Sequence, residues 1–247
     1  MNAMKPPEQL IEMWLEDGER VKENYVGLIS QEGLDSAKSL GERKKSRNWR
    51  FFDCLFEQVS LSSKDSILDV GCGKGELIDY FSLRFSDVRD CNYLGVDVVT
   101  EFVKLAKQKF SSRKFEERKF EERKFEERKF EVVNFIDPSF FPEKQFDIVI
   151  ALGVLVTRVR NYDLFVEYFV KKMVRCTKKY VLFNIISDID LSSGNYSDPN
   201  TVGHSTALNR EILHSFLDTI PNCNYRTIPY NIFPDATDLF VQIQLEA

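Results

Sequence analysis

Three glycines stand at alternate positions between an apolar run and an amphipathic run of this 247-residue chain. The stretch reads Ser66-Ile-Leu-Asp-Val-Gly-Cys-Gly-Lys-Gly75 and leads into Glu76-Leu-Ile-Asp-Tyr-Phe81. Glycine permits a tight turn and lets a ligand lie against bare backbone, and the following helix N-terminus offers unpaired N–H groups. The spacing is D-x-G-x-G-x-G, not the G-x-G-x-x-G of a dinucleotide fold. It predicts a buried strand, a ligand-binding turn and a helix, although any tight strand-to-helix turn could use such glycines.

An acidic residue follows at the end of the next predicted strand. Asp97 closes the apolar run Asn92-Tyr-Leu-Gly-Val-Asp-Val98, 22 residues after Gly75. A carboxylate at that place can accept hydrogen bonds from both hydroxyls of a ribose. Asp97 is therefore a candidate ribose ligand. The alternative is a strand-end aspartate that caps the following helix, a role that Thr100 could also fill.

The chain offers two histidines as general bases. His204 lies at the end of a long polar loop over residues 187–206, and we predict that it faces the acceptor; an exposed loop histidine is the alternative. His214 lies within a predicted helix and is interpreted as structural. Four polar residues of the loop and of a closing hairpin are candidate substrate contacts, and together they favour a small polar substrate such as an amine: Tyr196, Asp198, Tyr230 and Asp235.

Strands and helices alternate along the rest of the chain. Helices are predicted over residues 8–29, 43–59, 76–81, 102–110, 164–173 and 209–217. Strands are predicted over 66–70, 92–98, 131–136, 145–152, 180–186, 224–230 and 238–245, with a tight turn at Asn231–Thr237 between the last two. This order predicts an α/β fold: a doubly wound, mostly parallel seven-stranded sheet with helices on both faces.

Length and composition limit the remaining alternatives. We expect an N-terminal helical lid over residues 1–62 and one α/β domain over residues 63–247. No apolar run approaches the ~20 residues of a membrane span, and the absence of an apolar signal core favours a cytoplasmic protein. Five widely spaced cysteines argue against a zinc cluster or a disulfide framework, so no metal is predicted. A net charge of −5 does not indicate nucleic-acid binding, and the basic cluster at residues 43–47 is interpreted as a solvated face.

Residues 113–131 consist of a tandem repeat, RKFEE three times and then RKFE. Each full unit is electrically neutral, and its Arg-to-Glu and Lys-to-Glu spacings favour a helix. Five residues advance a helix by about 500°, so successive phenylalanines fall roughly 140° apart and cannot form one apolar stripe. We interpret the repeat as an expansion of one RKFE unit that leads into the next strand, and expect a protruding helical insertion. A neutral insertion is the simpler interpretation, whereas exposed phenylalanines would favour a homodimer contact.

In this order, the motifs resemble the class I S-adenosylmethionine-dependent methyltransferases over roughly residues 64–245. The resemblance implies a Rossmann-like fold, S-adenosylmethionine as cofactor and S-adenosylhomocysteine as product. It also extends to an N-terminal lid at Gly41–Phe52. The cofactor-binding residues that it implies are Arg50, Asp69, Gly71, Cys72, Gly73, Asp97, Val98, Asn134, Phe135, Leu152 and Gly153. Many members carry Asp at the position of Asn134, and asparagine can likewise accept a hydrogen bond from the adenine amine.

The implied activity is methyl transfer to nitrogen or oxygen of a small molecule, with His204, Tyr196, Asp198 and Tyr230 as candidate catalytic residues. Two alternatives stay open. An RNA or protein methyltransferase would call for a basic face near the pocket, and a non-catalytic binding protein could keep the fold and use the repeat as its partner surface.

Overall fold

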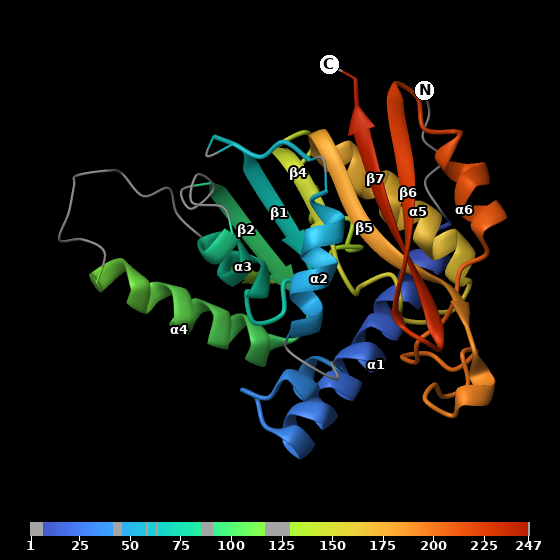
Figure 1. Cartoon of the computed structure of the whole chain (residues 1–247), viewed down its shortest axis with the longest axis horizontal. Coiled ribbons are helices and arrows are strands. Elements are labelled where there is room, and N and C mark those ends of the chain that lie inside the picture. The colour runs from blue at the N-terminus through green and yellow to red at the C-terminus, as the bar shows by residue number, and fades with distance from the viewer. Residues whose placement is uncertain are drawn as a thin grey trace.

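The computed structural model describes residues 7–41, 46–57, 59–62, 64–84, 91–116 and 129–246. A seven-stranded sheet runs through its centre (Figure 1). The strands are β1 (Ser66–Val70), β2 (Asn92–Asp97), β3 (Lys129–Val132), β4 (Phe146–Ala151), β5 (Thr177–Ile189), β6 (Cys223–Phe233) and β7 (Ala236–Leu245). Their spatial order is β3-β2-β1-β4-β5-β7-β6. Strands β1 to β5 pair in parallel, whereas β7 is antiparallel to both β5 and β6, so the predicted doubly wound, mostly parallel sheet is confirmed.

Helices cover both faces of the sheet. They are α1 (Glu8–Glu32), α2 (Ser46–Leu55), α3 (Glu76–Arg84), α4 (Thr100–Glu116), α5 (Tyr162–Cys176) and α6 (Arg210–Leu217), with two 3₁₀ turns, η1 (Ala37–Leu40) and η4 (Leu191–Ser193). One apolar core lies between the sheet and α1, α5 and α6, and a second lies under α2, α3 and α4. Adjacent residues of β1 serve different cores: Leu68 packs in the first and Ile67 in the second. A strand buried on both faces needs this unbroken apolar sequence.

The third strand is shorter and earlier than predicted. It ends at Val132, and Asn134 to Ile136 form a turn instead of the end of a strand. The Asn134 side-chain oxygen accepts a hydrogen bond from the Ile136 backbone N–H at 3.3 Å, and the Asn134 carbonyl accepts one from Asp137 at 3.0 Å. Asparagine offers the backbone such local bonds in place of a strand ladder, which explains the early end.

The closing hairpin also differs from its prediction. Strands β6 and β7 extend to Phe233 and Ala236, so the turn is two residues long rather than Asn231–Thr237. Strand β5 runs to Ile189 because its antiparallel ladder with β7 continues to the pair Ile189 and Ala236. The ends of β5 and β7 depend on pairing between segments that are distant in the chain. Local sequence patterns therefore do not predict these ends.

The tandem repeat lies partly outside the described residues. Residues 117–128 are among those not described, as are Arg43, Lys44 and Lys45 of the basic cluster. Lys129, Phe130 and Glu131 of the last RKFE unit lie within β3 itself, which was predicted to begin at Glu131. Phe130 of that unit is buried and stacks on Phe110 of α4 with ring centroids 5.6 Å apart, so this phenylalanine is a core residue rather than an exposed one.

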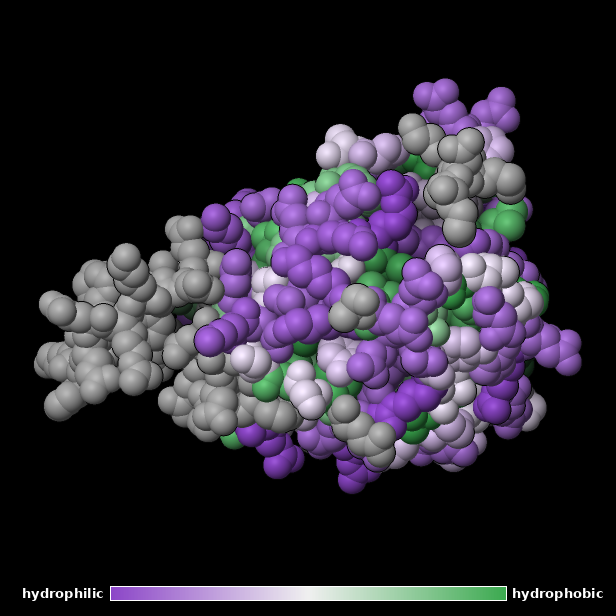
Figure 2. Space-filling model, turned by 90° about the horizontal axis from the view of Figure 1, so that it is seen from above, coloured by the Kyte–Doolittle hydropathy of each residue, from purple (hydrophilic) through white to green (hydrophobic). Residues whose placement is uncertain are grey.

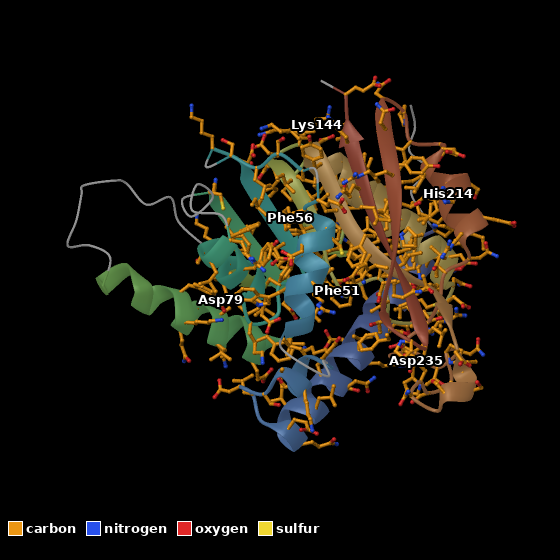
Figure 3. All side chains as sticks on the ribbon, viewed as in Figure 1. Phe51, Phe56, Asp79, Lys144, His214 and Asp235 are labelled. Atoms are coloured by element: carbon orange, nitrogen blue, oxygen red, sulfur yellow. The ribbon has the colours of Figure 1, made fainter. Side chains whose placement is uncertain are left out.

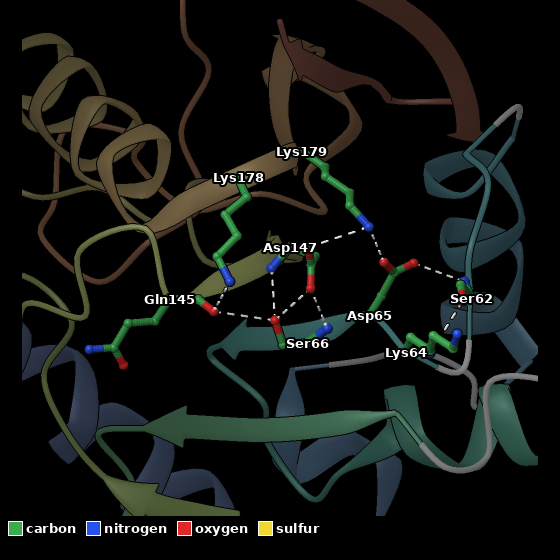
Figure 4. A network of polar contacts seen from close by, with 8 residues as sticks. All are labelled: Ser62, Lys64, Asp65, Ser66, Gln145, Asp147, Lys178 and Lys179. Carbon is green, nitrogen blue, oxygen red and sulfur yellow. Dashed lines mark hydrogen bonds and ion pairs between the residues drawn. The ribbon is translucent and has the colours of Figure 1, made fainter. Parts of the chain in front are cut away.

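A polar network joins β1, β4 and β5 near their first residues (Figure 4). The Asp147 carboxylate accepts hydrogen bonds from the Ser66 backbone N–H at 2.9 Å and from the Ser66 hydroxyl at 2.8 Å. The Lys179 ammonium forms ion pairs with both Asp147 and the buried Asp65. The network fixes the relative register of three parallel strands at the end opposite to their ligand-binding edge.

Helix α1 is held against the sheet by one aromatic residue and one buried acid. The Trp14 ring is almost fully buried and stacks on Tyr168 with centroids 5.5 Å apart. Its indole N–H donates to the Arg160 carbonyl at 2.8 Å. Buried Asp17 accepts hydrogen bonds from the Arg160 backbone N–H at 2.7 Å and from its Nε at 2.8 Å. The helix is thus fixed to the segment that follows β4.

One face of the molecule is mostly polar. Figure 2 shows a face on which hydrophilic side chains predominate and hydrophobic ones form small, scattered patches. None of the described helices combines the length and the apolar character that a bilayer crossing requires.

Replacement of Trp14 tests whether α1 is integral to the folded domain. We expect Trp14→Ala to lower the free energy of unfolding by about 3 kcal/mol or more, because it removes a fully buried ring and an internal hydrogen bond. Val26→Ala on the same helix should change it by less than ~0.5 kcal/mol, because Val26 lies at the surface with an exposed fraction of 41%. Urea denaturation of both variants measures the difference, and equal effects would contradict an integral α1.

Candidate functional site

The glycine turn occupies backbone conformations that favour glycine. Gly71, Gly73 and Gly75 have φ of 73°, 51° and 78°. A Cβ atom on Gly71 would lie 2.3 Å from the Val154 side chain, and one on Gly75 would lie 2.4 Å from Phe110. Both conformation and space therefore require glycine at the first and last positions of the motif.

Hydrogen bonds from the turn attach it to β2. The backbone N–H groups of Gly71 and Cys72 both donate to the Val96 carbonyl, at 2.8 and 3.1 Å. The Asp97 carboxylate accepts from the Gly73 N–H at 2.9 Å and from the Val99 N–H at 2.8 Å. Burial raises the pKa of Asp97, against the opposing effect of these N–H donors. Asp97 thus bonds to the backbone just before α4, which begins at Thr100, and also holds the glycine turn beside the cavity.

Asp69, the acid that precedes the turn, is almost fully buried. The Tyr93 hydroxyl donates to its carboxylate at 2.6 Å. Burial raises the pKa of Asp69 to about 7, although the hydrogen bond from Tyr93 acts in the opposite direction. The neighbouring Cys72 thiol has its pKa raised by burial as well, so it stays protonated near neutral pH.

Lys74 ties the glycine turn to the N-terminal segment. Its side chain is buried, and its ammonium donates to the carbonyls of Leu34 at 3.1 Å and Ser36 at 2.7 Å and to the Ser39 hydroxyl at 3.4 Å. These acceptors belong to η1 and the turn before it. Leu40 and Gly41, which follow, line the cavity above the glycine turn.

A cavity of about 590 Å³ lies at the carboxyl ends of the parallel strands. Its walls come from the glycine turn, the ends of β2 and β4, the 195–205 loop and the inner side of α1. Phe51, which Figure 3 labels on α2, closes it from the second core. Pockets of a few hundred to a thousand cubic ångströms hold cofactor-sized ligands.

Backbone hydrogen bonds attach the polar loop to the segment after β4. Thr157 and Ser205 form an antiparallel bridge, the Arg158 N–H donates to the His204 carbonyl at 2.8 Å, and the Gly203 N–H donates to the Arg158 carbonyl at 2.9 Å. These backbone bonds place His204 at the cavity wall.

The tautomer of His204 follows from its partner. Its Nδ1 lies 3.1 Å from the Asp198 carbonyl oxygen. A carbonyl can only accept, so Nδ1 must carry the hydrogen, and in the neutral ring Nε2 is then an acceptor. This is the form that a general base needs.

Most of the predicted site residues meet at this cavity. Those that line it are Asp69, Gly71, Cys72, Gly73, Asp97, Val98, Asn134, Phe135, Leu152, Gly153, Tyr196 and His204. They come from five separate segments that the parallel sheet brings to one edge.

Four predicted residues lie elsewhere among the described positions. Arg50 is exposed on α2 and is absent from the described cavity lining. Asp198 is exposed and accepts hydrogen bonds from Asn200 and Thr201, because aspartate in a turn bonds to its own neighbours. Tyr230 packs edge-on against Phe240, and the carboxylate of Asp235 accepts a hydrogen bond from Asn195. Direct ligand contact by these four has no support in this geometry.

The sequence interpretation missed two polar residues of the cavity. Asn184 on β5 and Asp238 on β7 are both buried and both line it. It also missed the part of α1 that forms a wall, where Gly18 leaves space for the Asn134 side chain and Asn24 meets Gly203 of the polar loop. For Asn184, a polar residue inside the apolar run of residues 180–186 was the available signal.

The chain matches the family model described as a methyltransferase domain over residues 61–221, more than half of its length. The chain belongs to this family. The prediction of a class I S-adenosylmethionine-dependent methyltransferase is thereby confirmed. This methyltransferase chain is also 30% identical over 56 residues to 235L, a protein of Invertebrate iridescent virus 6 that carries the name of a methyltransferase. That match spans 23% of this chain and 20% of the viral protein.

Solved structures share the fold of this methyltransferase at low identity. Magnesium protoporphyrin IX methyltransferase from Synechocystis PCC 6803, with bound S-adenosylhomocysteine, superimposes with a TM-score of 0.59 at 13% identity, covering 90% of this chain and 99% of that one. The [4+2]-cyclase SpnF superimposes with a TM-score of 0.58 at 14% identity, covering 93% and 96%. One architecture thus carries proteins named for different reactions, so the acceptor must be argued from the site.

The pKa of Asp69 predicts a pH-dependent stability. Its folded value of about 7 exceeds the ordinary value of 3.8, so the native state holds a proton that the unfolded state releases. Stability contributed by this group is present below pH ~4 and is lost as the pH rises toward about 7. Asp69→Asn should therefore gain stability relative to the parent chain between pH 5 and pH 8. Urea denaturation at both pH values measures this gain, and a pH-independent difference would contradict the raised pKa.

Proposed function

We propose that this chain transfers a methyl group from S-adenosylmethionine to a nitrogen or oxygen atom of a small polar molecule and releases S-adenosylhomocysteine. The observation that carries the proposal is a single cavity that joins the glycine turn and Asp97 to the polar loop with His204. A cofactor and an acceptor can therefore lie side by side in one cavity, as direct transfer requires.

The residues present fit this cofactor. The backbone of Gly71 and Gly73 lines the cavity beside β1, and Asp97 supplies a carboxylate at the end of β2. We assign the ribose to Asp97 and the adenine to the Asn134–Phe135 turn. When bound, the sulfonium supplies an activated methyl group. The protein has to align the acceptor and exclude water, tasks suited to the apolar side chains of Phe51, Leu152 and Val154.

His204 is the base in this proposal. An amine or a hydroxyl must lose a proton in the course of methylation, and the acceptor Nε2 of the neutral ring can take it. Tyr196 from the same loop lines the cavity beside it. No cluster of three or more metal-ligating side chains occurs in the part of the chain that the structure describes.

An RNA acceptor has less support. Its phosphates would have to be neutralised by Lys or Arg near the reaction site. The described residues that line the cavity include neither. Salt-dependent binding of RNA by the full chain would favour this alternative.

Removal of the Asp97 carboxylate tests the cofactor assignment. Asp97→Ala should weaken binding of S-adenosylhomocysteine by more than about tenfold, because a charged acceptor for two ribose hydroxyls is lost. Asp188→Ala, an exposed acid on β5, should leave the affinity unchanged. Isothermal titration calorimetry reports both values, and an unaltered affinity for Asp97→Ala would refute the ribose role.

The two histidines provide a matched test of the base. His204→Gln should lower kcat by about a hundredfold or more and leave the affinity for S-adenosylhomocysteine within twofold. His214→Gln should not affect either quantity, because His214 bonds to Tyr225 from α6, outside the cavity (Figure 3). Release of S-adenosylhomocysteine over a panel of amine and alcohol acceptors measures the rates. Equal rates for the two variants would exclude His204 as the base.

A further inference from the structure

The acid that precedes the glycine turn receives a hydrogen bond from the neighbouring strand. Strands β1 and β2 are parallel and lie side by side (Figure 1), and Asp69 pairs with Gly95. Tyr93 stands two residues before Gly95 on the same sheet face, because side chains alternate along a strand. Its hydroxyl donates to the Asp69 carboxylate at 2.6 Å. Asp69 lines the cavity, whereas Tyr93 supports it from outside the described cavity lining.

Aromatic packing fixes the Tyr93 ring, which is fully buried. Its centroid lies 5.5 Å from that of Phe130, the phenylalanine of the last repeat unit, and Phe130 in turn stacks on Phe110. Gly95 makes room for Phe130, because a Cβ atom there would lie 2.9 Å from the Phe130 ring. The last unit of the tandem repeat therefore supplies part of the packing that holds the tyrosine.

The hydroxyl of Tyr93 remains a hydrogen-bond donor. Burial and the nearby Asp69 carboxyl raise the pKa of Tyr93 well above its ordinary value, so the phenol keeps its hydrogen. A hydrogen bond from a phenol stabilises an ionised carboxylate, and here it acts against the burial that raises the pKa of Asp69 to about 7. Asp69 can therefore change its charge near neutral pH.

Other titratable groups around Asp69 favour its neutral form. Asp97 and Glu76 raise the pKa of Asp69 through their negative charges. The Cys72 thiol, whose own pKa is raised by burial, stays protonated beside it. The hydrogen bond from Tyr93 opposes these effects. A cation in the cavity would act in the same direction as Tyr93, because it too favours the charged carboxylate.

We infer that Tyr93 is a positioning residue that holds the Asp69 carboxylate at the cavity wall and favours its ionised form, in which Asp69 binds a cationic group of the cofactor. The inference rests on the proposed cofactor site and deepens it. S-adenosylmethionine carries two such groups, the ammonium of its amino acid part and the sulfonium, and S-adenosylhomocysteine carries the ammonium alone. A buried carboxylate attracts either cation strongly, because little water screens the attraction.

The pH dependence of cofactor binding tests the charge of Asp69. With a pKa of about 7, about one tenth of this carboxyl is ionised at pH 6 and about nine tenths at pH 8. In isothermal titration calorimetry, S-adenosylmethionine should bind the native chain about tenfold more tightly at pH 8 than at pH 6. Asp69→Asn should abolish this gain. A gain that persists in Asp69→Asn would overturn the inference.

Two further ligands identify the group that Asp69 binds. Methylthioadenosine keeps the adenosine and the sulfur but carries neither cation, so its affinity should change by less than about twofold between pH 6 and pH 8. For S-adenosylhomocysteine, a tenfold gain assigns the ammonium to Asp69, and a flat profile assigns the sulfonium. An equal gain for methylthioadenosine would overturn the binding of a cation.

Tyr93→Phe keeps the buried ring and removes only the donor. This variant should bind S-adenosylmethionine about fivefold more weakly than the native chain at pH 7 and within about twofold of it at pH 9, because alkali ionises Asp69 without the tyrosine. Comparison at one pH cancels any titration of the ligand itself. A loss of equal size at pH 7 and pH 9 would show a merely structural role and overturn the inference.

Tyr225→Phe is the matched control. The Tyr225 hydroxyl also donates to an aspartate, Asp218, at 2.7 Å, and neither residue belongs to the described cavity lining. Its removal should leave the affinity for S-adenosylmethionine unchanged at both pH values. A pH-dependent loss of the same size in this variant would contradict a specific role of Tyr93.

A measurement without ligand separates the role of Tyr93 from the cofactor assignment. Nuclear magnetic resonance of a chain with isotopically labelled aspartate carboxyl carbons follows the titration of Asp69, and Asp69→Asn identifies its signal. The midpoint should lie near pH 7 in the native chain and at higher pH in Tyr93→Phe. An unchanged midpoint would overturn the role of Tyr93. A raised midpoint in a chain that fails to bind S-adenosylmethionine would support that role and overturn the cofactor site.

Discussion

The parallel pairing of β1 with β2 on one side and β4 on the other is the constraint on which the site depends. Parallel strands end at the same edge, so the residues that follow each strand meet there although they are far apart in the chain. The Gly73 N–H can reach the Asp97 carboxylate only because β1 and β2 stop in register. The polar network at the amino ends of β1, β4 and β5 stabilises the same register from the opposite end of the strands.

A second set of contacts holds α1, η1 and the polar loop around the carboxyl ends of the parallel strands. Trp14 and Asp17 fix α1 to Arg160, and Lys74 fixes η1 to the glycine turn. The polar loop contacts α1 at Asn24, whose side-chain amide leaves no room for a side chain on Gly203. Segments from the beginning, the middle and the end of the chain therefore share the walls of one cavity.

Local patterns were enough to predict the sheet and the glycine turn, and most of the predicted site residues line the cavity. Buried parallel strands need continuous apolar runs, and glycines with positive φ have few substitutes, so both leave a clear mark in the sequence. The end of β3 was misplaced because an asparagine turn at Asn134 competes with the strand. Asn184 and Asp238 were missed because only the antiparallel pairing of β5 with β7, set by distant segments, brings them together. Asp198, predicted as a substrate contact, accepts hydrogen bonds from residues of its own turn and is not among the described residues that line the cavity.

The residues that line the cavity come partly from the segment that matches the family model and partly from outside it. The segment that identifies the family covers residues 61–221 and contains the glycine turn, Asp97 and the polar loop. Trp14, Tyr25 and Phe51 lie before that segment and Asp238 lies after it, yet all four line the same cavity. The family segment thus carries the residues to which we assign the cofactor and also His204, whereas the two flanking segments complete the wall of the cavity. Divergence confined to the flanks could redirect such an enzyme to a new acceptor while its cofactor chemistry stays the same.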